Sequence, residues 1–189
     1  MPLRWLKQKL RYSRGDQPVA PTELRVNFGV DVPEIIYGVN PVIEIIKRRP
    51  SDIKKIFLAH EKGNKSAKAL LDLAQRERVA IEYKERQALE QLAHTSHHQG
   101  VVAIVIPRRE TGIESIIASW RTSGEKLLAL ILDGIQDPQN LGALVRSACA
   151  AGAHGVITLR DRSSPVTGAV YKASAGAVEH IPVVSVVNI

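Results

Sequence analysis

Apolar residues recur along the chain in short blocks that alternate between strand-like and helix-like spacing. The unbroken apolar block at residues 127–132 is typical of a parallel strand buried on both faces. A polar loop containing Pro138 follows, and Asn140 is placed to cap a helix that ends at Gly152. Residues 155–159 predict the next strand. The pattern predicts a β-loop-α-β unit, and open α/β sheets bind ligands at the loop of such a unit.

The same alternation predicts a compact first domain over residues 34–107. Strands are predicted at residues 35–37, 53–59, 79–83 and 101–106, and helices at 42–47, 65–78 and 87–93. Asn40 is expected to cap the first helix, with Pro41 at its first position. Strands that alternate with helices imply an α/β layer fold. A polar connector, residues 108–126, contains a short helical segment at 113–120, and residues 127–189 add a second helix at 166–179 and a strand at 182–187.

Residues 1–33 are expected to lie outside both domains, as a basic arm followed by a proline-containing linker. Five basic residues and no acidic one occur in the first fourteen positions: Arg4, Lys7, Lys9, Arg11 and Arg14. Three interpretations compete, namely an RNA-contacting arm, an organelle transit segment and a solvated tail. The segment matches the serine-rich and arginine-rich composition of transit peptides only in part, so the arm or the tail is favoured.

Composition narrows the class of protein. The chain is 44% hydrophobic and 24% charged, as in globular domains, and its net charge of +7 favours a polyanionic partner such as nucleic acid. The single cysteine, Cys149, excludes an internal disulfide and fits a reducing compartment, so a cytoplasmic location is expected. No apolar run approaches the roughly 18 residues of a membrane span. His97 and His98 have no third ligand at a usual spacing, which favours a polar turn over a metal site.

Two residues of the β-loop-α-β unit are chemically unusual. Asn140 lies where the loop meets the helix, and Arg146 lies inside a helix that is otherwise apolar or small. The simpler interpretation makes Asn140 a cap and Arg146 a surface residue with a buried stem. The alternative is a permanently charged guanidinium held beside a reacting group or a phosphate. A dinucleotide site is disfavoured because no G-x-G-x-x-G motif opens this helix.

The segment DGIQDPQNLGALVRSACAAGAHGVI resembles the first signature motif of the SpoU family of RNA 2′-O-ribose methyltransferases, which have a knotted (SPOUT-type) α/β fold. The N-x-G-x-x-x-R core is present as Asn140, Gly142 and Arg146, and residues 172–177, KASAGA, resemble the stretch after that motif. The resemblance implies that Arg146 helps to activate the ribose 2′-hydroxyl and that Asn140 helps to arrange the site. It also implies S-adenosylmethionine as methyl donor, no metal, and a homodimer.

The pattern YGVNPVIEII … HHQGVVAIVIP resembles the small N-terminal RNA-binding domain of SpoU enzymes that modify large-subunit ribosomal RNA. The resemblance places five residues near the RNA-facing edge: Tyr37, Gly38, Asn40, Gln99 and Gly100. Basic residues nearby would contact phosphates without regard to sequence. These are Lys47, Arg48, Arg49, Lys54 and Lys55. For any one of these cations, a solvated surface charge is the simpler interpretation.

The chain departs from the family pattern after residue 187. Two further SpoU motifs build the S-adenosylmethionine pocket, and we expect that pocket to lie C-terminal to Ile189. The resulting expectation is a ribosomal RNA methyltransferase that is truncated and inactive alone, with an unpaired edge in its parallel sheet. The alternative is a non-catalytic RNA-binding module derived from the same family. An unrelated nucleotide-binding α/β protein would require the Asn140–Arg146 pattern to be a coincidence.

Overall fold

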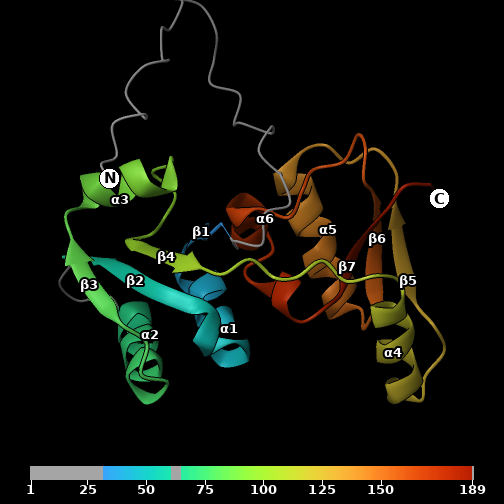
Figure 1. Ribbon diagram of the computed structural model, residues 1–189, viewed down its shortest axis with the longest axis horizontal. Coiled ribbons are helices and arrows are strands. Elements are labelled where there is room, and N and C mark those ends of the chain that lie inside the picture. Colours follow the sequence, from blue (N-terminus) through green and yellow to red (C-terminus); the bar gives the residue numbers. More distant parts are fainter. Residues whose placement is uncertain (1–31, 61–64, 189) are drawn as a thin grey trace, which may run out of the picture. The chain divides into compact units, whose positions relative to one another are not determined.

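The computed structural model describes residues 32–60 and 65–188, which contain two β-sheets and the helices that cover them (Figure 1). This confirms the predicted α/β class. The basic arm predicted at residues 1–14 lies outside the described residues. Within the described part of the chain, no helix is both long and apolar enough to cross a membrane.

The first sheet has four strands in the order β1-β4-β2-β3. Its strands are β1 (Glu34–Tyr37), β2 (Ile53–Ala59), β3 (Ile81–Lys84) and β4 (Val101–Val105), and only the β2–β3 pair is parallel. The helices of this segment are α1 (Val39–Arg48), α2 (Lys65–Arg76) and α3 (Arg86–Ala93), with a 3-10 turn, η1 (Pro50–Asp52), before β2.

Alternation along β2 explains how this sheet is covered on both faces. Ile56 and Leu58 point to the face covered by α1 and α2, whereas Phe57 points to the opposite face and packs with Leu89 of α3 (Figure 1). All four side chains are buried. Because both faces are covered, the second half of β2, residues 56–59, is an unbroken apolar run in the sequence.

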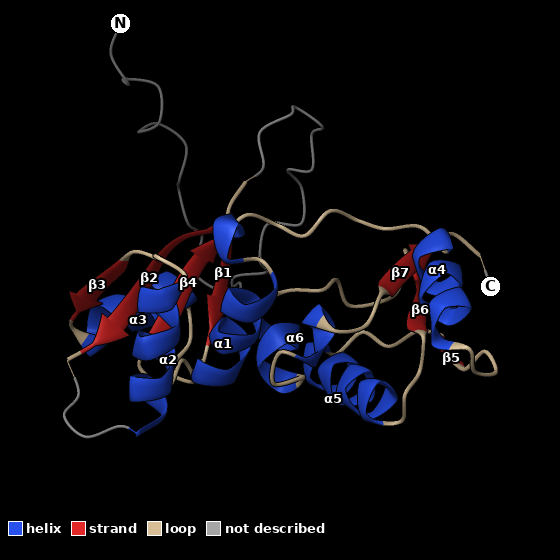
Figure 2. Ribbon diagram, turned by 90° about the horizontal axis from the view of Figure 1, so that it is seen from below, coloured by secondary structure: helices blue, strands red, loops and turns tan. Residues whose placement is uncertain are grey.

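The second sheet is parallel, in the order β5-β6-β7. Its strands are β5 (Ala129–Leu132), β6 (Gly155–Leu159) and β7 (Val183–Val186), and its helices are α4 (Glu114–Ser123), α5 (Pro138–Ala150) and α6 (Gly168–Ala173), followed by the 3-10 turn η2 (Ala177–Glu179) (Figure 2). Val156 of β6 packs with α5, whereas the neighbouring Gly155 faces Ile116 of α4. A Cβ on Gly155 would lie 2.3 Å from the Ile116 side chain, so this position requires glycine.

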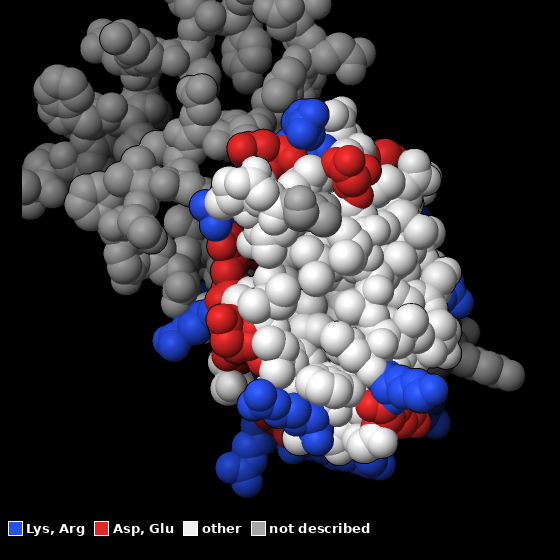
Figure 3. Space-filling view, turned by 90° about the vertical axis from the view of Figure 1, so that its right-hand side faces the viewer, with Lys and Arg blue, Asp and Glu red and all other residues white. Residues whose placement is uncertain are grey.

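The prediction that residues 127–132 form a strand buried on both faces is wrong. Among the described strands β5 pairs only with β6, and it begins at Ala129. Leu127, Leu128 and Ile131 are 52%, 49% and 54% exposed. Seen from the side on which β5 and α4 lie in Figure 1, a broad area carries no charged side chain (Figure 3). Among the described strands β5 thus lies at the edge of the sheet, and the expected unpaired edge is confirmed for the described residues.

Three helix boundaries also differ from the predictions. Helix α1 begins at Val39 with Gly38 as its N-cap, so Asn40 lies inside the first turn and does not cap it. The helix predicted at 166–179 is interrupted after Ala173, because Ala175 and Gly176 adopt φ values of 52° and 87°. A left-handed pair of residues ends α6 and starts η2. The N-cap of α5 is described with the site below.

Buried residues from both sheet segments belong to one large apolar cluster, and Phe57, Leu89 and Val102 form a smaller one on the other face of the first sheet. Ile36 and Val42 from the first segment belong to the same cluster as Leu141 and Tyr171 from the second. Helix α6 is central to this packing, since it contacts both β1 and α5. The turns predicted to face RNA and the candidate catalytic helix thereby belong to one compact unit, which contains all described residues.

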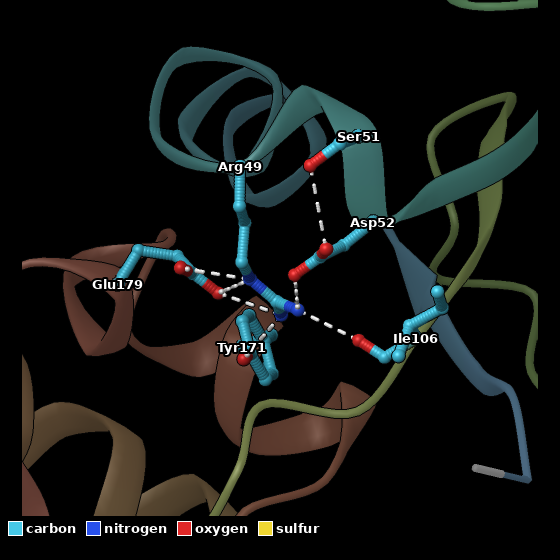
Figure 4. Close-up of polar contacts among 6 residues, drawn as sticks. All are labelled: Arg49, Ser51, Asp52, Ile106, Tyr171 and Glu179. Carbon is cyan, nitrogen blue, oxygen red and sulfur yellow. Dashed lines mark hydrogen bonds and ion pairs between the residues drawn. The ribbon is translucent and has the colours of Figure 1, made fainter. Parts of the chain in front are cut away.

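A part-buried ion-pair network also joins the two segments (Figure 4). The Arg49 guanidinium donates to both carboxylate oxygens of Glu179, at 3.0–3.2 Å, and to the Tyr171 hydroxyl at 3.2 Å. Its Nη1 donates to Asp52 Oδ2 at 3.2 Å and to the Ile106 carbonyl at 2.6 Å. Burial alone would lower the pKa of Arg49, but the hydrogen bonds and charge of Glu179 raise it well above its ordinary value.

Candidate active-site helix and RNA-facing turns

Helix α5 carries both residues of the candidate catalytic pair. Its N-cap is Asp137, whose carboxylate accepts hydrogen bonds from the backbone N–H groups of Gln139 (3.2 Å) and Asn140 (3.1 Å). The sequence prediction of Asn140 as the cap was therefore wrong. Pro138 takes the first helical position, where its missing N–H costs nothing, and this moves the start of the helix back. The Asn140 side chain is exposed and is not used for capping.

Arg146 is exposed near the middle of α5. Its guanidinium makes no hydrogen bond or ion pair with any other described residue. The neighbouring apolar residues of the helix, Leu141 and Val145, are fully buried. A long cationic side chain that no carboxylate holds is available to a ligand, although a solvated surface arginine would look the same.

Close packing explains why the middle position of the N-x-G-x-x-x-R pattern, Gly142, is a glycine. A Cβ at this position would lie 2.4 Å from the Ala173 Cβ and 2.9 Å from both Ser174 N and Val170 O. These contacts belong to α6 and its end, so Gly142 allows α5 and α6 to touch through their backbones. The two sequence segments that carry the family resemblance are thus packed directly on each other.

The helix does not bring Asn140 and Arg146 onto one face. Six residues separate them, which corresponds to about 9 Å along the axis and about 120° around it. Arg146 is four residues from Gly142 and therefore lies near the face that packs on α6, whereas Asn140 points elsewhere. The Cα–Cβ bonds of the two residues therefore leave the helix in different directions.

The structure does bring together the turns of the first segment that were predicted to face RNA. The Gly38 N–H donates to the Val101 carbonyl at 3.0 Å, and the Ala59 N–H donates to the Gly100 carbonyl at 2.9 Å. Gln99 and Gly100 both have positive φ, at 54° and 73°, which forms the tight turn before β4. Tyr37 and Gly38 therefore adjoin the Gln99–Gly100 turn, although about sixty residues separate them in sequence.

These predicted RNA-facing residues differ in exposure. Asn40 and Gln99 are exposed, whereas Gly38 and Gly100 are buried as backbone elements of the turns. Tyr37 is half-buried, and burial raises the pKa of its hydroxyl. Its ring packs beside Gly168 at the start of α6, where an added Cβ would lie 3.2 Å from Tyr37 Cε1.

The predicted phosphate-contacting cations are mostly engaged within the fold. Lys47 pairs with Glu44 at 2.8 Å, Lys55 pairs with Glu82 at 2.9 Å, and Arg48 bonds to His180 Nδ1. Arg49 is held by the network of Figure 4 and is not available for phosphate. Lys54 is exposed and has no hydrogen-bond or ion-pair partner among the described residues.

The two adjacent histidines have different environments. His98 is fully buried, and its Nδ1 accepts a hydrogen bond from the Gly100 N–H at 3.0 Å, which stabilises the turn before β4. His97 is exposed. In residues 32–60 and 65–188, no cluster of three or more histidine, cysteine, aspartate or glutamate side chains could hold a metal ion.

Two family models match the chain in succession. Residues 35–111 match the model described as RNA 2′-O ribose methyltransferase substrate binding, and residues 127–189 match the SpoU rRNA methylase family. The chain belongs to the SpoU rRNA methylase family. The matched SpoU segments contain every candidate residue described above, from Tyr37 to Arg146.

SpoU relatives align with most of this chain but extend beyond it. The 23S rRNA (guanosine-2′-O-)-methyltransferase RlmB of Pseudomonas syringae is 41% identical over 158 residues, and RlmB of Escherichia coli K12 is 35% identical over 159. Each match covers 82% of this chain, but only 62% and 64% of the relatives. The SpoU methyltransferase AviRb of Streptomyces viridochromogenes, solved with AdoMet, matches with a TM-score of 0.65 and 23% identity, over 82% of this chain and 56% of that one. This last match supports the fold.

The sequence did not predict the structural roles of three residues in this region. Asp137 could have been found, because an aspartate followed by proline is a typical start of a helix. The close approach at Gly142 has no local signal beyond the glycine itself. Lys172 lies in the KASAGA stretch but was given no role; its side chain lies over the Gly38 turn, which only the three-dimensional packing reveals.

Proposed function

We propose that the protein containing this chain transfers a methyl group from S-adenosylmethionine to a ribose 2′-hydroxyl of ribosomal RNA. The family membership carries this proposal, since both RlmB relatives are named 23S rRNA (guanosine-2′-O-)-methyltransferases and a structural relative was solved with AdoMet. Within the family, residues 34–107 would bind RNA and residues 127–189 would form part of the methyltransferase domain, joined by residues 108–126.

Arg146 is proposed as the residue that activates the ribose hydroxyl. A 2′-hydroxyl is a poor nucleophile until its proton is removed or its alkoxide is stabilised. An unpaired guanidinium can stabilise the developing negative charge electrostatically, and no carboxylate of the described residues forms an ion pair with Arg146. Asn140 would act separately, on another face of α5, by hydrogen bonding to the RNA or to the loop before the helix.

The described residues do not enclose a site for the methyl donor by themselves. A ligand of that size is normally mostly buried in its pocket. The carboxyl ends of β5, β6 and β7 are followed by Asp133, Arg160 and Val187, which are all exposed. These residues could supply only one wall of a donor pocket, so we assign no step of the reaction to donor-binding residues in this part of the chain.

RNA is the proposed partner of the turns around Tyr37, Gly38, Asn40, Gln99 and Gly100, with Lys54 contacting phosphate. Lys55 could join it only by leaving Glu82.

We also propose a homodimer, supported by the uncharged surface of Figure 3, and sedimentation of the intact protein would test it. A cytoplasmic location fits an enzyme of ribosomal RNA, and cell fractionation would test that placement.

A methyl-transfer assay tests the proposed function. The intact protein is incubated with a 23S rRNA transcript and tritiated S-adenosylmethionine, and 2′-O-methylation is read from dinucleotides that resist alkaline hydrolysis. Arg146→Ala should abolish transfer while the affinity for RNA changes little, whereas Ser147→Ala, at the next exposed position of α5, should remain active. Full activity of Arg146→Ala would refute the role of Arg146. Absence of methyl transfer by the wild-type protein, together with RNA binding, would favour the RNA-binding module.

A further inference from the structure

Lys172 is a partly buried cation for which the described part of the chain offers no counter-charge. It lies on α6, and it makes no hydrogen bond or ion pair with any described residue. Burial lowers the pKa of its ammonium group, with no compensating interaction from a carboxylate. Glu44, the acidic residue of α1, is already bonded to Lys47 and His180. A partly desolvated ammonium without a partner costs folding free energy, and a bound anion would offset that cost.

The position of Lys172 is fixed by the packing of α6 on β1. Gly168 and Lys172 are four residues apart and therefore share one face of the helix. A Cβ on Gly168 would lie 2.4 Å from the Ile35 carbonyl oxygen, which shows that this face is pressed against β1. A Cβ on Gly38 would lie 2.9 Å from both Cδ and Nζ of Lys172. The lysine side chain thus occupies space that any other residue at position 38 would fill.

The ammonium therefore lies at the meeting point of two parts of the proposed active region. On one side is the turn that contains Tyr37 and Gly38, which the family resemblance assigns to RNA. On the other side is the next residue of α6, Ala173, which packs against Gly142 in the helix of Arg146. A group bound here would be held against both parts at once.

We propose that Lys172 binds a backbone phosphate of the RNA substrate at the turn formed by Tyr37 and Gly38, and so positions the RNA relative to α5. This inference rests on the proposed function, because it takes the ligand to be RNA. A phosphodiester fits because it is an anion and because a flexible lysine contacts it as a point charge without reading the base. Lys172 is a positioning residue and takes no part in the chemical step.

The salt dependence of RNA binding tests this assignment. Affinity for a short, fluorescein-labelled single-stranded RNA of mixed sequence is measured by anisotropy at several salt concentrations. Lys172→Met removes the charge but keeps the stem, and Lys68→Met, at an exposed position of α2, is the matched control. Loss of one phosphate contact should reduce the slope of log K against log salt by about 0.7. Affinity should fall on the order of fivefold, while Lys68→Met changes neither quantity.

Thermal unfolding separates a binding role from a structural one. Because the ammonium is desolvated and unpaired, Lys172→Met should leave the melting temperature unchanged or raise it. A lowered melting temperature with an unchanged salt slope would make Lys172 structural and overturn the proposal. An unchanged slope in a chain that binds RNA would overturn the role of Lys172 and leave the proposed function intact. If the wild-type chain does not bind RNA at all, both fail.

Discussion

The ion pair between Arg49 and Glu179 gives the sharpest stability prediction. Its side chains are only 13% and 2% exposed, so solvent screens the charges little. Glu179→Gln keeps the shape of the side chain and one acceptor oxygen but removes the negative charge. Breaking a buried pair typically costs about 3–5 kcal/mol, because the remaining charge loses its partner. Arg49 would retain Asp52 and the Ile106 carbonyl, so we expect a loss near the lower end, about 3 kcal/mol.

The assay is urea denaturation of the chain followed by far-UV circular dichroism. The midpoint should fall with an unchanged slope, which would show that stability and not compactness has changed. Glu82→Gln is the matched control, since the Lys55–Glu82 pair has a similar distance of 2.9 Å but both side chains are over 40% exposed. This control should leave the midpoint almost unchanged.

A double substitution provides the second check. The double variant Arg49→Met/Glu179→Leu removes both charges. Its loss of unfolding free energy should be clearly smaller than the sum of the losses for Arg49→Met and Glu179→Leu measured singly. Two results would refute the reasoning: a cost below about 1 kcal/mol for Glu179→Gln, as in exposed pairs, or strict additivity in the double variant.

Three further predictions concern stability. Gly142→Ala should destabilise the chain by about 1–2 kcal/mol, although alanine favours helices, because its Cβ would overlap α6. The control Ala143→Gly, at an exposed position of the same helix, should cost about 1 kcal/mol through helix propensity alone. A Gly142→Ala variant that is more stable than wild type would contradict the close packing of α5 on α6. Asp137→Ala should cost about 1 kcal/mol in a denaturation experiment, with Asp137→Asn losing much less, and equal losses would argue against the cap. Burial raises the pKa of Glu44, but hydrogen bonds from Lys47 and His180 outweigh it, so the pKa lies below its usual 4.5. Because the pKa of Glu44 is lower in the folded state than in the unfolded state, Glu44 stabilises the fold above about pH 4.5, and this contribution disappears as the pH falls through the folded-state pKa. The melting temperatures of wild type and Glu44→Gln should therefore converge in acid. A difference in melting temperature that does not change with pH would contradict this coupling between the pKa of Glu44 and stability.

Local patterns were sufficient where one element decides its own structure. The strands Ile53–Ala59 and Gly155–Leu159 were predicted to the residue, because apolar runs bounded by turn residues mark both ends. The apolar run before Asp133 was predicted to be a strand buried on both faces, but among the described strands β5 lies at the edge of the sheet and is partly exposed. Sequence alone cannot distinguish the two, since the number of neighbouring strands depends on the whole sheet.

Side-chain contacts between residues far apart in the chain could not be predicted from local sequence patterns. Arg49 and Glu179 are 130 residues apart, so the sequence offered only a basic residue in a basic cluster, and a phosphate contact was predicted. The close approach of the Lys172 side chain to Gly38 likewise could not be predicted from the sequence. In contrast, Asn140 and Arg146 were identified through their motif, although the motif did not reveal that they face different directions. The role of both residues stays a prediction until methyl transfer is measured.

The large apolar cluster that unites the two segments also determines how the chain opens. Residues of β2 and β6 are buried in that cluster, so we expect their backbone amides to be among the slowest to exchange with solvent and to do so at a common rate. RNA held at the turns before α1 and β4 would then slow exchange in the parallel sheet as well, although it touches none of those strands. RNA bound to the first sheet segment would thus be detectable as slower amide exchange in the second.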